Sequence, residues 1–198
     1  PLHQEIGPIL PDTFPNLSSD LDLFLSTHPR TMYIALGSHI FTTPENYVTL
    51  LQSALELINQ NILDVFTQFA ILSHENTKIF LSHGGVGSSH ESMYTATPML
   101  VLPIVFDQSG NAERLELTGM ALKISKLDLK VDDIISKVKR LLNEESFKTN
   151  AMRMQVLAKF NSKRKYRGAD LIEIMLNLAK YDGNRNENGE LEVDIETL

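Results

Sequence analysis

The residues with the clearest chemical potential lie in one segment, residues 80–91 (FLSHGGVGSSHE), where an apolar run leads into glycines and then a helix-forming stretch. Glycines let a ligand approach the backbone closely, and the free amides at a helix start attract an anion such as a phosphate. Ser88 adds a hydroxyl and His83 an imidazole. Glu91 lies one turn into the expected helix, where its carboxylate can accept a hydrogen bond from a sugar hydroxyl. The segment therefore indicates a site for a sugar-phosphate group.

The same residues also fit a purely structural interpretation. Ser88 to Glu91 have the spacing of a capping box, in which Glu91 returns to the backbone of its own helix. Glycines after a strand are common in any α/β turn. Spacing alone leaves both interpretations open.

Three other classes of site are excluded by inspection of the sequence. A His-Gly-Gly strand end also occurs at esterase oxyanion holes, but no serine here has glycine both two residues before and two residues after it. Tyr94 stands where the second histidine of a zinc-peptidase helix would be. The chain also contains neither a P-loop nor a G-x-G-x-x-G motif.

Composition sets the wider limits. The 198 residues are enough for one ordinary core, and the absence of cysteine excludes disulfides and thiolate metal sites. The net charge is -7, but residues 182–198 hold six acidic residues against one arginine, so the rest is close to neutral and predicts no nucleic-acid partner. No apolar stretch reaches transmembrane length and no signal peptide opens the chain. We expect a soluble piece of a longer protein.

Short apolar runs alternate with helix-forming stretches along the chain. Residues 31–36 form an apolar run closed by Gly37-Ser38, as expected for a strand buried on both faces. Further strands are expected at residues 62–67, 78–82, 99–103 and 121–125, and helices at residues 21–26, 44–60, 73–76, 89–96, 111–118, 131–142, 146–160 and 169–181. This alternation predicts an α/β fold with a Rossmann-like parallel sheet and helices on both faces, binding its ligand at the carboxyl ends of the strands.

The chain divides into three parts at this level. Residues 1–20 are proline-rich and linker-like, residues 21–181 form the expected domain, and residues 182–198 are an acidic tail predicted to be disordered. The helix at residues 169–181 is apolar nearly all round, which is more than packing on one surface requires. We therefore expect it to pack against a second partner as well.

A longer pattern extends the first segment in both directions. It consists of His83-Gly84-Gly85, Ser88, Glu91, Thr97-Pro98-Met99, Pro103, Asp107-Gln108 and Asn111-Ala112, preceded by Gln68 and by Ile71-Leu72-Ser73-His74. This pattern resembles the signature of the UDP-glycosyltransferase family, which includes glucuronosyltransferases and plant and fungal glucosyltransferases. The resemblance covers about residues 6–180. It implies the C-terminal, donor-binding half of a GT-B glycosyltransferase.

The resemblance also implies roles for individual residues. His83 and Ser88 would contact the diphosphate, beside Ser38 and the helix-start amides around Gly85 and Gly87. Glu91 would hold the ribose hydroxyls, Gln68 would belong to the same UDP-sugar site, and Asp107 and Gln108 would read the transferred sugar. Donors positioned at a helix start stabilise the charge that a leaving diphosphate gains. A UDP-sugar would be the co-substrate, with no cofactor and no metal expected.

The sequence departs from the family pattern in several places. Gly87 replaces the usual asparagine and Ala96 the usual glycine before Thr97. The stretch between Leu57 and Gln68 is much shorter than in relatives, and the chain has no tryptophan to stack on uracil, so Phe66 or Phe69 would have to substitute. We therefore expect a fold shortened by an internal deletion, with lower stability or a rearranged sheet edge.

The family activity is inverting transfer of a hexose from a UDP-sugar to a hydroxyl of a small lipophilic acceptor. The catalytic base and acceptor site of relatives lie in an N-terminal domain that nothing ahead of Ile6 encodes, so no catalytic residue is assigned and the chain is expected to be inactive alone. The alternatives are a degenerate UDP-binding or structural module, and an interaction protein that docks through residues 169–181. A membrane would be reached only through a parent chain, and the localisation is left unassigned.

Overall fold

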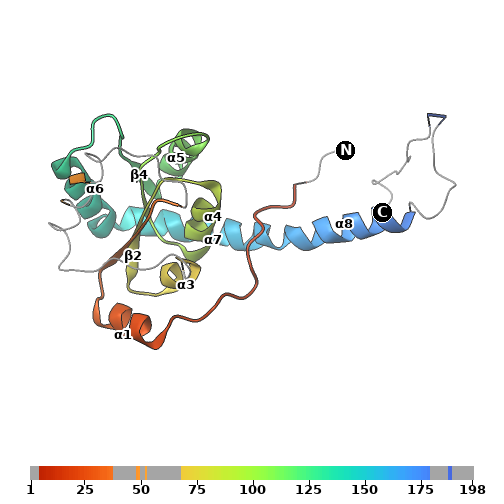
Figure 1. Cartoon of the computed structure of the whole chain (residues 1–198), viewed down its shortest axis with the longest axis horizontal. Coiled ribbons are helices and arrows are strands. Elements are labelled where there is room, and N and C mark those ends of the chain that lie inside the picture. Colours follow the sequence, from red (N-terminus) through yellow and green to blue (C-terminus); the bar gives the residue numbers. More distant parts are fainter. Residues whose placement is uncertain (1–4, 38–47, 50–51, 53–67, 179–186, 189–198) are drawn as a thin grey trace. The chain divides into compact units, whose positions relative to one another are not determined.

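A four-stranded parallel sheet forms the centre of residues 11–157 in the computed structural model, which describes residues 5–37, 48–49, 52, 68–178 and 187–188 (Figure 1). Its strands are β1 (Thr31–Ala35), β2 (Thr77–Ser82), β3 (Met99–Val101) and β4 (Ala121–Lys123), in the spatial order β1-β2-β3-β4. All three pairings are parallel. The predicted α/β fold is therefore confirmed.

Seven helices lie in the described part of the chain. They are α1 (Ser19–Thr27), α3 (Gln68–Ser73), α4 (Val86–Thr95), α5 (Gln108–Leu117), α6 (Val131–Asn143), α7 (Glu145–Ser162) and α8 (Arg164–Leu178). The helix expected at residues 73–76 is wrong, because the helix lies at α3 and residues 74–76 form the turn into β2. The helix expected at residues 44–60 and the strand expected at residues 62–67 lie outside the described residues, apart from Val48, Thr49 and Gln52, which are helical.

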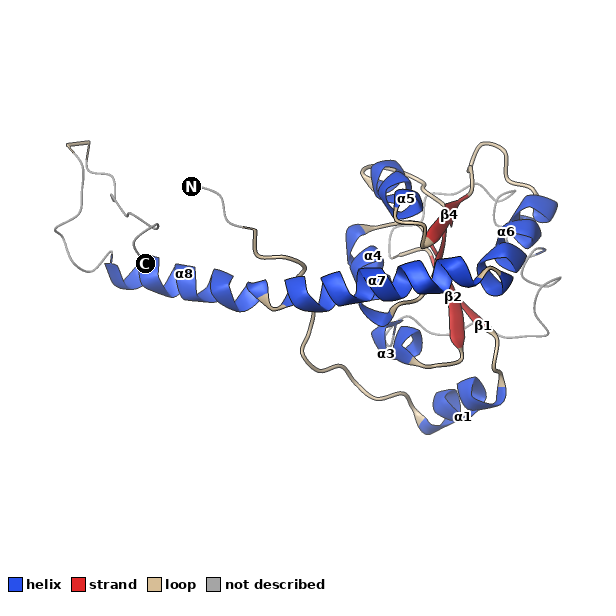
Figure 2. Ribbon diagram, turned by 180° about the vertical axis from the view of Figure 1, so that it is seen from behind, coloured by secondary structure: helices blue, strands red, loops and turns tan. Residues whose placement is uncertain are grey.

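The two faces of the sheet carry separate cores, because successive side chains of a strand point to opposite faces. Phe80, Met99 and Val101 pack with apolar side chains of α1, α3, α4, α5 and α7. Ile79 and Leu100 pack with the apolar stripe of α6. Figure 2 shows α6 on the opposite side of the sheet from α3 and α4. Helices on both faces are thus confirmed.

β1 is less buried than its continuous apolar run predicts. Only Tyr33 is fully buried in this strand, and the residues on either side of it are half-buried. Among the described residues, β1 has β2 as its single strand neighbour and lies at the edge of the sheet. An edge strand is covered by fewer neighbours than a central one, so the expectation of burial on both faces was wrong for β1.

The chain forms two compact units, residues 11–157 and residues 1–10 with 158–198. The first holds the sheet. In the second, the extended segment before Leu10 lies against α8: Lys165 Nζ donates to the carbonyl of Leu10 at 2.5 Å and Arg164 pairs with Glu5 at 3.7 Å. A Cβ on Gly168 would lie 2.8 Å from Ile6, so the helix needs glycine where this segment crosses it.

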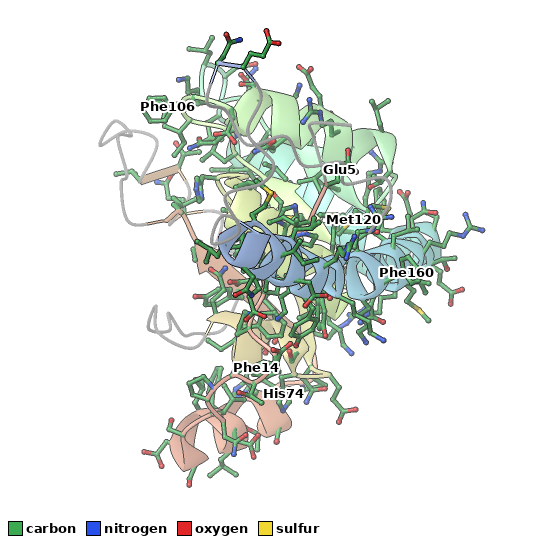
Figure 3. The ribbon with its side chains drawn as sticks, turned by 90° about the vertical axis from the view of Figure 1, so that its right-hand side faces the viewer. Glu5, Phe14, His74, Phe106, Met120 and Phe160 are labelled. Atoms are coloured by element: carbon green, nitrogen blue, oxygen red, sulfur yellow. The ribbon has the colours of Figure 1, made fainter. Side chains whose placement is uncertain are left out.

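Several large apolar side chains remain exposed, including Phe106 and Phe160, whose rings extend outward in Figure 3. On α8, Ile172 is 62% and Leu176 63% exposed, which leaves much of its apolar surface uncovered by the described residues. None of the described helices is long and apolar enough to cross a membrane.

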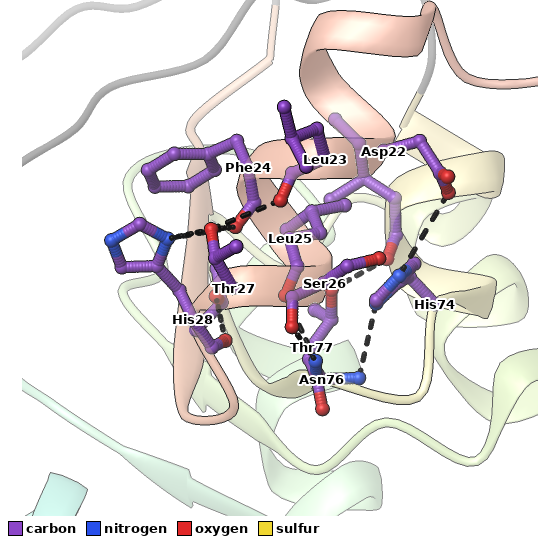
Figure 4. A network of polar contacts seen from close by, with 12 residues as sticks. Asp22, Leu23, Phe24, Leu25, Ser26, Thr27, His28, His74, Asn76 and Thr77 are labelled. Atoms are coloured by element: carbon purple, nitrogen blue, oxygen red, sulfur yellow. Dashed lines mark hydrogen bonds and ion pairs between the residues drawn. The ribbon is translucent and has the colours of Figure 1, made fainter.

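A polar network ties α1 to the turn that enters β2 (Figure 4). The side-chain amide of Asn76 donates to the carbonyl of Leu25 at 2.9 Å, and the backbone amide of Asn76 donates to His74 Nδ1 at 3.1 Å. Because Nδ1 of His74 accepts this bond, Nε2 carries the proton in the neutral ring and faces Asp22 at 4.0 Å. These contacts hold residues 74–76 in place immediately before β2.

Candidate functional site

The carboxyl ends of β1 and β2 bring two glycine-containing turns together. The two strands pair with Ala35 opposite Ser82, so Gly37 and His83 follow side by side. A Cβ on Gly37 would lie 2.8 Å from the His83 ring, and one on Gly85 would lie 2.5 Å from His83 Nε2. The imidazole is therefore held between two backbones that only glycine allows to come so close.

The chemistry of His83 follows from this confinement. Burial lowers the pKa of the imidazole below its ordinary value of 6.5, and the carboxylate of Asp107 opposes that shift in part. The ring is therefore neutral at pH 7. Its Nδ1 atom is buried and has no hydrogen-bond partner among the described residues. Buried polar atoms normally have partners, so this nitrogen calls for a partner from outside the described residues.

A second cluster joins α3 to α4. The side-chain amide of Gln68 donates to Glu91 Oε2 at 2.6 Å and contacts Ser88 Oγ at 3.2 Å. Burial raises the pKa of the Glu91 carboxyl, and the bond from Gln68 lowers it in part. Three residues expected to bind one ligand are thus in direct contact.

The structure tests whether Ser88 and Glu91 form the capping box that their spacing allows. α4 begins at Val86, its N-cap is Gly85, and no side chain caps it. Ser88 and Glu91 lie inside the helix, and the carboxylate of Glu91 is bonded to Gln68 on another helix. The capping box does not form.

The start of α4 presents backbone amides beside these groups. Val86 is 56% exposed and Gly87 is also exposed, so the first turn is accessible. Apart from its chain neighbours and the backbone of its own helix, no described residue has a heavy atom within 4 Å of a Cβ placed on Gly87. The position therefore has room for the asparagine that the family pattern carries there. Within the described residues, no group of three or more His, Asp or Glu could hold a metal ion.

Asp107 and Gln108 begin the next helix and differ in their surroundings. Asp107 is exposed and accepts a hydrogen bond at 2.8 Å from the side chain of Asn111. Gln108 is 8% exposed, and its Oε1 accepts from the backbone amides of Ile104 and Val105 at 2.8 and 2.9 Å. The oxygen of Gln108 thus holds the loop between β3 and α5, while the Asp107 carboxylate faces outward.

The expectation that Phe69 could stack on uracil is wrong, and two other expected residues lie outside the described part of the chain. The ring of Phe69 is 7% exposed and lies between Phe14 and Tyr94, with centroid distances of 4.3 and 5.4 Å. Phe69 is therefore part of the core and offers no free face to a uracil. Ser38 and Phe66 lie outside the described residues.

Comparison with known proteins agrees with this fold. The model of the family described as UDP-glucoronosyl and UDP-glucosyl transferase matches residues 62–163, just over half of the chain. UDP-glycosyltransferase 1 of Phaeomoniella chlamydospora is 34% identical over 87% of this chain and 42% of its own length. UDP-glucuronosyltransferase 2A3 of Mus musculus is 32% identical over 61% of this chain and 26% of its own length. Among solved structures, Os79 from O. sativa, in complex with U2F and trichothecene, aligns with a TM-score of 0.62 and 20% identity over 74% of this chain and 41% of its own.

The fold corresponds to the donor-domain half of a GT-B glycosyltransferase. The chain belongs to the UDP-glucoronosyl and UDP-glucosyl transferase family. It spans about 42% of the length of the fungal relatives. The alignment with the Phaeomoniella chlamydospora relative extends over 205 residues, more than the 198 of the chain, so that relative carries residues without a counterpart here.

Proposed function

We propose that this chain binds a UDP-sugar at the carboxyl ends of β1, β2 and β3. The observation that carries the proposal is the contact of Gln68 with both Ser88 and Glu91, which gathers residues from two helices beside the free α4 amides. His83 supports it with a ring nitrogen that is buried and unpartnered in the described part of the chain. A diphosphate needs donors, a ribose needs a carboxylate acceptor, and both kinds of group lie here.

Each group has a distinct task in this proposal. The α4 amides, the Ser88 hydroxyl and His83 bind the diphosphate and stabilise the charge that it gains as the glycosidic bond breaks. Glu91 accepts from the ribose hydroxyls, and Gln68 orients that carboxylate through the bond of 2.6 Å. Asp107 accepts from hydroxyls of the hexose. Gln108 fixes the loop that carries Asp107 through its side-chain oxygen, so only its amide nitrogen is left to donate to the sugar.

The test is calorimetric titration of the chain with UDP. His83→Ala and Glu91→Ala should each weaken binding by about tenfold or more, because each removes a hydrogen bond that involves a charged group. Ser109→Ala is the matched control, since Ser109 is exposed on the neighbouring α5. UDP binding that is unchanged in both site variants would overturn the proposed site.

We further propose that the chain supplies the donor half of inverting hexose transfer to a hydroxyl of a small lipophilic acceptor, and that it is inactive alone. The proposal rests on family membership and on the 42% coverage of the fungal relatives. Hexose transfer from UDP-glucose by the chain without a partner would refute inactivity. Transfer only on addition of an N-terminal acceptor domain from a relative would support it.

A degenerate module without transferase activity is the second candidate, and the burial of Phe69 favours it. The described residues offer no stacking face from this ring, so the uracil loses an aromatic contact worth about 1 kcal/mol. Wild-type chain that is folded by circular dichroism and shows no heat of UDP binding would favour this candidate. UDP binding that depends on His83 and Glu91 would exclude a purely structural role.

A further inference from the structure

Asn111 joins the two parts of the candidate site. Its side-chain nitrogen donates to the carbonyl of Gly84 at 3.0 Å and to Asp107 Oδ2 at 2.8 Å. Gly84 belongs to the turn that leads to the phosphate-binding amides, and Asp107 is the carboxylate assigned to the hexose. The Asn111 amide therefore connects the turn proposed to bind the phosphate with the carboxylate proposed to bind the sugar.

The geometry at both partners is fixed by the surrounding structure. Gly84 has φ +82, and a Cβ there would lie 2.7 Å from the side chain of Val101 on β3, so the turn is packed against the sheet. On the other side, Gln108 holds the loop before α5 through two backbone amides. Asn111 lies one helical turn after Asp107 on the same helix, which places its amide beside the carboxylate. Both partners are acceptors, so the group that faces them must be the NH₂.

We propose that Asn111 is a positioning residue that holds the Asp107 carboxylate at a fixed distance from the phosphate-binding turn. This rests on the proposed function of the site. Asp107 is exposed, and without Asn111 its side chain would be free to rotate in solvent. The hexose of a bound UDP-sugar would then lose an oriented acceptor, while the diphosphate would keep the α4 amides and His83. The loss should fall on the sugar and not on the nucleotide.

A merely structural role makes a different prediction. A hydrogen bond to an exposed carboxylate contributes little to stability. If Asn111 only braced the turn through Gly84, its removal would weaken UDP and UDP-glucose binding by the same factor. The ratio of the two affinities therefore separates positioning from bracing.

The experiment is calorimetric titration of the full chain with UDP and with UDP-glucose, for wild type, Asn111→Ala and the control Ser109→Ala. Asn111→Ala should lower the UDP-glucose affinity by about tenfold and the UDP affinity by less than about threefold, because the hexose loses its oriented hydrogen bond to the charged Asp107 carboxylate. Ser109→Ala should leave both unchanged. In the Asp107→Ala background, adding Asn111→Ala should cause no further loss specific to the sugar.

Other outcomes overturn the inference in recognisable ways. Equal losses for the two ligands, or a sugar-specific loss that persists without Asp107, would show that Asn111 does not act through Asp107. If Asn111→Ala does not fold, Asn111→Leu tests the same point, because it keeps a similar volume, removes the donor and adds no charge that would repel the diphosphate. Wild-type chain that binds neither ligand would overturn the proposed function, and the role of Asn111 with it.

Discussion

At the scale of residues, His83 gives the candidate site its pH dependence. Burial lowers the pKa of the free imidazole below 6.5, whereas a bound diphosphate would favour the charged ring and raise that pKa. Binding then takes up a proton, so affinity should rise as pH falls from 8 to 6. UDP-glucose is the suitable probe, because its diphosphate has both ends esterified and does not titrate in this window. Calorimetry in buffers of different ionisation enthalpy measures the proton uptake, and His83→Asn should abolish it. Uptake that persists in this variant would assign the proton to another group.

Gly87 offers a gain-of-binding test at the same scale. A Cβ at this position meets no atom of another described segment within 4 Å, and the position is exposed in the first turn of α4. Gly87→Asn should strengthen UDP binding by about threefold to tenfold, since a side-chain amide adds one donor to the anion. The same variant should not lower the melting temperature, which differential scanning calorimetry can check. Weaker binding in a folded variant would mean that the diphosphate does not approach α4 from this side.

Phe106 has a strained backbone conformation whose cost in stability can be measured. Its φ is 56°, a left-handed conformation that is costly for a bulky residue, and its side chain is 88% exposed. Phe106→Asn should raise the free energy of unfolding by about 0.5–1 kcal/mol, because asparagine tolerates this conformation and little burial is lost. Urea denaturation measures the change. A decrease in stability would show that the phenyl ring makes packing contacts that its exposure does not suggest.

The residues of the site were predictable in part. The glycine-rich turn, His83 and Glu91 stand in one short segment, so their types and spacing indicate a phosphate and sugar site. The link from Gln68 to Glu91 crosses 23 positions and depends on where α3 and α4 pack, which no local pattern encodes. Asn111 had a detectable signal, an amide four residues after Asp107 on an expected helix. The burial of Phe69 had none, because the sequence does not show that Phe14 and Tyr94 meet it.

At the scale of elements, α5 provides a matched pair of glycine substitutions. Gly110 lies within the helix, where an added methyl group would meet no other segment among the described residues. Gly119 follows the helix with φ +72 and faces the side chain of Asn150. Gly110→Ala should stabilise the protein by about 0.5–1 kcal/mol through reduced backbone entropy of the unfolded chain. Gly119→Ala should destabilise it by about 1 kcal/mol or more, through the left-handed backbone and the collision. Opposite shifts in the urea midpoint check both, and shifts of the same sign would contradict this account of the helix end.

The ends of helices matched the sequence prediction where one local residue or period sets them. They differed from the prediction where packing sets them. α5 ends before Gly119, as expected because glycine readily adopts the left-handed conformation that stops a helix. α6 covers the residues whose apolar side chains recur with the helical period. α4 begins three residues before the expected start at Ser89, because Gly85 takes the N-cap position in place of the serines. Ala96 ends α4 in a left-handed conformation at φ 55, and Lys148 of α7 donates to its carbonyl at 2.7 Å. That contact between distant segments supports an alanine where the family pattern has glycine.

At the scale of the whole molecule, the division into two compact units sets where ligand binding should be felt. All described residues of the candidate site belong to the unit of residues 11–157. A ligand stabilises the cooperative unit that holds its site, by mass action, and leaves an independent unit unchanged. Saturating UDP should therefore slow amide hydrogen exchange in β2, α4 and α5, with no change in α8. Mass spectrometry of peptic fragments measures this directly, with His83→Ala as the variant in which protection is lost. Equal protection of α8 would mean that the two units unfold as one.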